Sequence, residues 1–187
     1  MAAKGLMKVK SLLIPDDSRV EAQPLYVPGL VIKGKPHNVV LVASMGNHVF
    51  AFDTDASEGQ DLLWTSTLLS NPYVPIAKPA QNPEGRETNV DLWGIFLWGI
   101  LSTPVIDLDK QQMYLVNWTE GPDPNNPVLL LQRIGLTDGK EIGKGQLLKG
   151  ALTDSGGKPV LDFRGKAVQL NPNQKQRAAL LLSPLRG

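Results

Sequence analysis

The chain has no cysteine and only two histidines among its 187 residues. The absence of cysteine excludes disulfide scaffolds, thiolate metal sites and cysteine nucleophiles. The chain has nineteen basic and eighteen acidic residues, which give it a formal charge of +1. That balance gives the chain no field with which to attract nucleic acid or an anionic membrane, so neither is predicted as a partner.

Long apolar runs are also missing. The best run, Leu92–Leu101, is interrupted by glycine and is too short to span a bilayer, so no membrane insertion is predicted. At the N-terminus, Lys8 and Lys10 break the apolar stretch that a signal peptide requires. No signal peptide is therefore visible in this sequence.

Proline and glycine are plentiful, at 15 and 18 residues. They punctuate the chain every few residues and leave little room for long helices. Hydrophobic residues make up 42% and charged residues 20% of the chain, as in a globular protein with a core of ordinary size. These features predict an all-β fold.

The clearest pattern in the chain reads as three short strands separated by turns. Val39–Ser44 is apolar and β-branched, and Leu62–Trp64 forms the third strand signal. Between them, His48–Asp53 alternates, which places Phe50 and Phe52 on one face and the residues between them on the other. Three antiparallel strands in one run are typical of the core of a β-propeller blade.

Two apolar segments precede this run. Met7–Leu13 alternates weakly and is predicted as an edge strand. Gln23–Ile32 carries Pro24 and Pro28, and a proline within a strand confines it to a sheet edge or to the neighbourhood of a bulge.

A second set of strand signals follows later in the chain. It repeats the order strand, turn, strand, loop, strand and hairpin turn, and weaker strand signals come after it. The predicted strands are Leu101–Asp107, Gln112–Trp118, Val128–Ile134, the weak outer strand Glu141–Leu148, Val160–Leu170 and Ala178–Ser183, with the hairpin turn at Thr137–Lys140.

Three segments carry a resemblance to a known family. Ala22–Leu30 (AQPLYVPGL), His37–Asp53 (HNVVLVASMGNHVFAFD) and Trp98–Asp107 (WGILSTPVID) resemble the opening blades of bacterial pyrroloquinoline-quinone-like (quinoprotein-like) β-propeller proteins. The repeat of that family carries Ala-x-Asp-x-x-x-Gly-x-x-x-Trp after its third strand. The residues that keep this order here, with wider gaps, are Ala51, Asp53, Gly59 and Trp64.

The second set keeps less of the same repeat motif. Arg133 and Gly135 stand where the Ala and the Asp would be, Gly139 is kept, and Gly143 replaces the Trp. By the resemblance, Trp64 packs between neighbouring blades.

The resemblance implies antiparallel β-propeller blades in a single partial propeller of about two to three blades. Blade 1 would run from about 22 to 68, a long connection from 70 to 92, blade 2 from about 101 to 148, and the start of blade 3 from about 160 to 187. A propeller of this kind closes with about six to eight blades. We therefore expect either a fragment of a longer protein or a homo-oligomer whose copies complete the propeller.

The long connection supplies the candidate binding residues. Ser70–Asn89 is rich in proline and shows little periodicity, and loops of this length inside a domain are usually functional or disordered. An ordered surface excursion without a ligand is the preferred alternative. The candidates in and beside it are Tyr73, Arg86, Trp93 and Trp98. For the two tryptophans, packing is preferred, and stacking on a sugar or a quinone ring is the alternative.

Two patterns could suggest a metal. Asp53–Gly59 spaces its oxygen ligands as a calcium loop does, but its glycine and glutamate are misplaced, and a turn whose Asp side chains bond their own backbone is preferred. His37 and His48 have no carboxylate at ligand spacing, so structural polar roles are preferred for both. No metal site and no catalytic residue are predicted.

The function predicted from these features is a non-catalytic binding or scaffold module with an unknown ligand or protein partner and no predicted cofactor. One alternative is a fragment of a dehydrogenase that depends on pyrroloquinoline quinone (PQQ) and calcium, although such enzymes typically carry a vicinal cysteine pair that this chain lacks. A second alternative is a truncated propeller fragment without independent activity. Relatives by resemblance are mostly periplasmic or secreted, and the location of this chain stays open.

Overall fold

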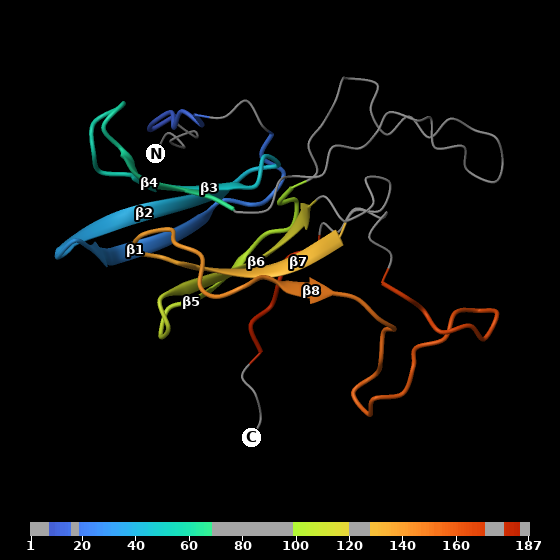
Figure 1. Cartoon of the computed structure of the whole chain (residues 1–187). Coiled ribbons are helices and arrows are strands. Elements are labelled where there is room, and N and C mark those ends of the chain that lie inside the picture. The colour runs from blue at the N-terminus through green and yellow to red at the C-terminus, as the bar shows by residue number, and fades with distance from the viewer. Residues whose placement is uncertain (1–7, 16–18, 69–98, 120–127, 171–177, 184–187) are drawn as a thin grey trace, which may run out of the picture.

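The computed structural model describes residues 8–15, 19–68, 99–119, 128–170 and 178–183, which contain two four-stranded antiparallel sheets (Figure 1). In each sheet the strands pair in chain order. None of the described residues lies in a helix, so the predicted all-β class is confirmed. The described part of the chain has no helix long and apolar enough to cross a membrane.

Sheet 1 contains the first four strands, and proline fixes the character of its edge. Pro28 lies in an edge strand whose register shifts between Val27 and Leu30. Because proline has no N–H to donate, the edge and the bulge are where it costs least, and this prediction is confirmed. The strands are β1 (Leu25–Ile32), β2 (Lys35–Ala43), β3 (His48–Asp53) and β4 (Leu62–Thr67).

Sheet 2 repeats the same meander later in the chain. Its last strand is shorter than the predicted Glu141–Leu148, because Gly143 takes a positive φ of 73° and Glu141 forms only an isolated bridge with Ile134. The strands are β5 (Val105–Asp107), β6 (Gln112–Thr119), β7 (Val128–Gly135) and β8 (Gln146–Leu148).

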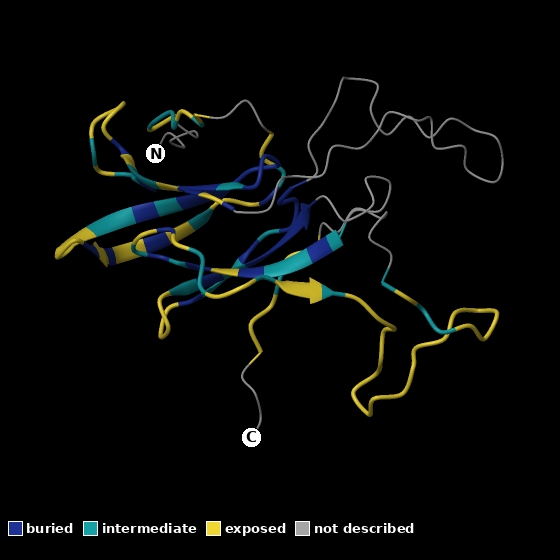
Figure 2. Cartoon of the chain, viewed as in Figure 1, coloured by how far each residue is buried: buried dark blue, intermediate teal, exposed yellow. Residues whose placement is uncertain are grey.

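The two sheets pack face to face around one hydrophobic core. Val49 and Ala51 of β3 share this core with Met113, Leu115 and Ile134 of sheet 2, and all five are at most 1% exposed. Figure 2 shows the buried residues concentrated between the two layers. The predicted alternation of β3 is therefore confirmed, since one set of its side chains faces sheet 2 and the other faces away.

The outer face of sheet 1, which carries Val40, Val42, Phe50 and Phe52, is covered by residues 8–15. Leu12 and Ile14 pack against these side chains. The prediction of an edge strand at Met7–Leu13 was wrong, because residues 8–13 lie in no strand. Alternate side chains of this segment contact the face of the sheet, but its backbone does not pair with an edge strand.

Sheet 2 is covered on its outer side by another distant segment. Leu180 packs with Val116, Trp118 and Leu129, and its N–H donates to the Thr103 carbonyl at 3.0 Å. The strand predicted at Ala178–Ser183 is absent, because this segment also contacts the sheet mainly through side chains.

The strand predicted at Val160–Leu170 was also wrong, because turns replace it. The Asp154 carboxylate accepts from the N–H groups of Gly156 and Lys158, and the Asp162 carboxylate accepts from those of Arg164 and Lys166. Each Asp thereby closes a tight turn, and the strand-like pairing within residues 151–169 is limited to isolated bridges.

Candidate functional site

The structure describes some of the predicted site residues and not others. The four binding candidates Tyr73, Arg86, Trp93 and Trp98 lie outside the described residues. The residues of the predicted repeat motif are described. Ala51, Trp64 and Gly139 meet at a joint between the sheets, Asp53 belongs to a polar network at one end of sheet 1, and Gly59 takes a positive φ of 82° between β3 and β4.

The joint is made by Trp64, which reaches from β4 to the turn after β7. Its indole Nε1–H donates to the Leu136 carbonyl at 3.0 Å. Its ring lies against Gly139, where a Cβ atom would come within 2.5 Å of the ring carbon Cε3. Gly139 also has a positive φ of 68°, so the turn and the close approach of the ring both favour glycine. We call these three residues the Trp64 joint.

Ala51 supports the Trp64 joint from within sheet 1. It lies opposite Trp64 in the pairing of β3 with β4, and none of its surface is exposed. A larger side chain at this position would enter the core between the sheets. The small residue of the motif and its tryptophan are thus neighbours across one strand pair.

A second contact between the sheets comes from the buried turn that joins β2 to β3. Asn47 has a positive φ of 62°, is 1% exposed, and donates through Nδ2 to the Trp118 carbonyl at 3.0 Å. Its own carbonyl accepts from the Leu68 N–H at 3.0 Å. Gly99 lies so close to this turn that a Cβ atom there would overlap the Met45 carbonyl. The turn therefore locks the sheets together on a second side.

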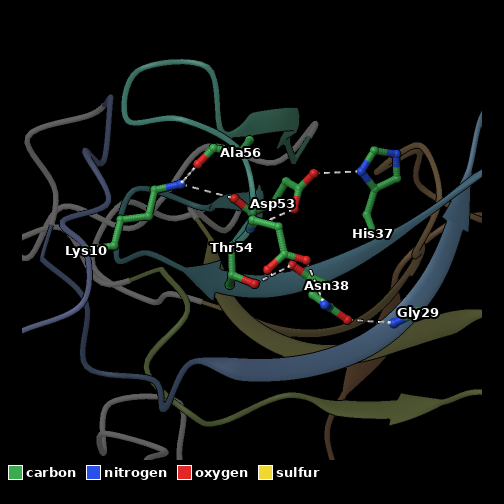
Figure 3. A network of polar contacts seen from close by, with 8 residues as sticks. Lys10, Gly29, His37, Asn38, Asp53, Thr54 and Ala56 are labelled. Carbon is green, nitrogen blue, oxygen red and sulfur yellow. Dashed lines mark hydrogen bonds and ion pairs between the residues drawn. The ribbon is translucent and has the colours of Figure 1, made fainter.

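The polar network begins at Asp53, the acidic residue of the motif. His37 Nδ1 lies 2.7 Å from Asp53 Oδ2, and the Asp55 N–H donates to Asp53 Oδ1 at 3.0 Å (Figure 3). Asn38 donates to Asp55 Oδ2 at 2.7 Å and accepts from the Gly29 N–H at 3.1 Å. The predicted turn in which an Asp bonds its own backbone is confirmed.

Lys10 joins the network from segment 8–15, and the sequence analysis did not identify it. Its Nζ donates to the Ala56 carbonyl at 2.6 Å and the Asp53 carbonyl at 3.2 Å, and lies 2.9 Å from Asp61 Oδ2. Three oxygens from the end of β3 and the following loop thus surround one ammonium group. The sequence signal that could have identified Lys10 is its alternation with Leu12 and Ile14, which puts the three side chains on the same side of the segment.

Two carboxylates of the network, those of Asp53 and Asp61, are held in their charged form. The hydrogen bond with His37 holds the pKa of Asp53 below its ordinary value of 3.8. The hydrogen bond from Lys10 likewise lowers the pKa of Asp61. Both carboxylates are therefore ionised at neutral pH and serve as fixed acceptors.

The network is organised as a mechanical link. A pair such as His37 and Asp53 can orient a general base. The hydroxyl of Thr54 in the same network is already engaged, because it donates to the Asn38 carbonyl at 3.0 Å. Among the described residues, no group of three potential ligands is placed to hold a metal ion. The arrangement ties β2, β3, the β3–β4 loop and segment 8–15 together.

His48, the other histidine, packs on the outer face of sheet 1. Its ring stacks on Phe50, with the two centroids 5.9 Å apart. It therefore lies apart from the pair made by His37 and Asp53.

Comparison with known proteins adds no family assignment. No protein-family model, curated protein or solved structure matches the chain.

Proposed function

We propose that this chain is a non-catalytic scaffold or binding module built from blades of the quinoprotein-like propeller type. The Trp64 joint carries this proposal. Two consecutive four-stranded meanders stack face to face, and a tryptophan after the third strand of one reaches the glycine turn of the next. A contact of this kind connects one repeat with the next, as in arrays whose units contact their neighbours in sequence.

The polar groups support a structural role. His37, Asp53, Asn38 and Asp55 are bonded to one another and to backbone groups, and Lys10 is held by three oxygens. Groups that must accept or release a proton in a reaction need access to a substrate. Here the hydrogen bonds of these groups connect elements of the fold.

The covered outer faces support a module that exists as a discrete body. Segment 8–15 covers sheet 1, and Leu180 covers part of sheet 2. Uncovered apolar sheet faces of this kind associate with one another and aggregate. A chain that covers both faces can instead present its loops and surfaces to a partner.

The first test is the mass of the purified chain in solution by light scattering, together with its unfolding curve. We expect a discrete species and a single cooperative transition. Trp64→Phe should lower the free energy of unfolding by about 1–3 kcal/mol, because the Leu136 carbonyl loses its donor and the joint loses packing. Tyr26→Phe, at a side chain that is 57% exposed, is the control and should change little. A polydisperse, non-cooperative sample would contradict the proposal.

The non-catalytic part of the proposal is tested separately. The chain is mixed with pyrroloquinoline quinone, calcium and an alcohol, and reduction of a redox dye is followed. We expect the dye to be reduced at the same rate as in a sample without the protein. Dye reduction that depends on quinone, calcium and the chain together would assign the protein to the quinone dehydrogenases instead.

A further inference from the structure

The strands of sheet 1 pair fully with one another without the segment that covers the outer face of the sheet. The strands β1 to β4 pair with one another along their length. Phe52 lies opposite Val40 and Phe50 opposite Val42, so the four side chains form one apolar patch across two strands. Such a patch does not need a fifth strand to keep its shape.

Segment 8–15 lies on this patch as a ligand would. Among the described residues, it makes no backbone–backbone hydrogen bond with the sheet. Leu12 and Ile14 face the patch, whereas Val9 is 94% and Leu13 is 83% exposed. The segment is therefore held by every second side chain, the pattern of an extended peptide bound through one side.

Lys10 adds a specific contact at one end of the patch. The ammonium group and the Asp61 carboxylate are largely buried, with 16% and 8% of the side chains exposed. Two backbone carbonyls, of Ala56 and Asp53, complete the set of acceptors. A buried carboxylate with two inward carbonyls is complementary to a cation, and it selects lysine at this position over a neutral or acidic residue.

We propose that the outer face of sheet 1 is a docking site for an extended segment of a partner protein with lysine followed by aliphatic residues two and four positions later. Residues Lys10, Leu12 and Ile14 occupy this site in cis and compete with the partner. The partner class follows from the charge of Asp61 and from the apolar patch beside it. This inference names a partner for the proposed scaffold, and only that link rests on the proposed function.

Competition in cis decides how strongly a partner must bind. A tethered segment is present at an effective concentration on the order of millimolar, so a free peptide of the same sequence is almost fully excluded from the wild-type chain. A partner binds when its own contacts exceed those of segment 8–15 or when that segment is displaced. The site is thus closed at rest and opens to a competing segment.

The test uses the full chain and a synthetic peptide of residues 8–15, KVKSLLIP. In one variant, Leu12→Asp with Ile14→Asp releases the segment from the patch. In the matched control, Val9→Asp with Leu13→Asp places the same charges on the exposed side of the segment. The milder variant Leu12→Ala with Ile14→Ala serves if the first does not melt cooperatively. Binding of the peptide is followed by fluorescence anisotropy.

We expect the released variant to bind the peptide at least about tenfold more tightly than the wild-type chain or the control. A peptide with glutamate in place of Lys10 should bind the released variant at least about tenfold more weakly than the parent peptide. A released variant that melts cooperatively but does not bind, or that binds both peptides equally, would overturn the docking site and leave the scaffold proposal intact.

Self-association of the released variant without peptide would also overturn the proposal, because a second copy would then cover the patch. Non-cooperative unfolding of the wild-type chain would instead count against the scaffold proposal. The two failures are therefore distinguishable.

Discussion

At the scale of single residues, Gly139 shows how one missing side chain allows two sheets to meet. Its φ of 68° disfavours a side chain, and the Trp64 ring leaves no room for a Cβ atom. Gly59, predicted as the matching glycine between β3 and β4, has a φ of 82°, but apart from its chain neighbours no atom lies within 4 Å of the position that a Cβ would take. Both glycines adopt a positive φ, but only Gly139 contacts the Trp64 ring.

Gly59→Ala should therefore lower the free energy of unfolding by about 1–2 kcal/mol, the cost of a left-handed residue. Gly139→Ala should cost about 1–3 kcal/mol more, because the new methyl group displaces the indole ring. Urea unfolding of both variants measures the difference. Equal losses would show that Trp64 moves away freely and that the joint does not hold the sheets together.

The same residue scale shows what could be read from the sequence. Alternation in β3 gave the correct faces for Phe50 and Val49, and Pro28 gave the edge strand with its bulge, because both depend on local geometry. The alternation of Lys10, Leu12 and Ile14 could not reveal what these side chains contact. A period of two indicates which side chains share a side, and it is the same for an edge strand and for a segment lying on a sheet face.

At the scale of elements, segment 8–15 and the β3–β4 loop are coupled by one ion pair. Lys10 lowers the pKa of Asp61, so Asp61 binds a proton less readily in the folded chain than in the unfolded chain. The stabilisation is present at pH values above the ordinary pKa of 3.8 and is lost as the pH falls through the lowered folded value. Acid should therefore loosen this contact.

We expect the wild-type chain to lose stability as the pH falls below about 4, and Asp61→Asn to lose less over the same range. Urea unfolding between neutral and acidic pH measures both slopes. Asp107→Asn is the comparison in sheet 2, where Lys110 lowers the pKa of Asp107 but segment 8–15 is not contacted. Identical pH slopes for the wild-type chain and Asp61→Asn would show that the ion pair does not stabilise the fold.

Residues 151–169 show at the same scale why strand signals fail. Asp154 and Asp162 each take two backbone N–H groups that a strand would have offered to a neighbour. Gly157 and Gly165 then adopt positive φ values of 77° and 75°. Because these turns repeat every eight residues, they interrupt pairing before a ladder forms, although valine and leucine between them have high strand propensity.

At the scale of the whole molecule, one core serves two sheets that are far apart in the sequence. Residues of β2 and β3 share it with residues of β6 and β7. The buried turn at Asn47 and the Trp64 joint connect the sheets on two sides. The strands of each sheet could be predicted locally, but this shared core depends on contacts between residues that are far apart in the sequence, which no local pattern records.

A shared core makes a prediction about cooperativity. Leu115 is fully buried in β6, and Leu115→Ala should cost about 2–5 kcal/mol. Leu147→Ala, at a side chain of β8 that is 43% exposed, is the control and should cost about 0.5 kcal/mol or less. Hydrogen exchange should then show amide protection falling by the same amount in β2–β3 and in β6–β7, although the substitution lies in sheet 2 alone. Loss of protection confined to β5–β8 would mean that the sheets unfold independently and that the joint does not couple them.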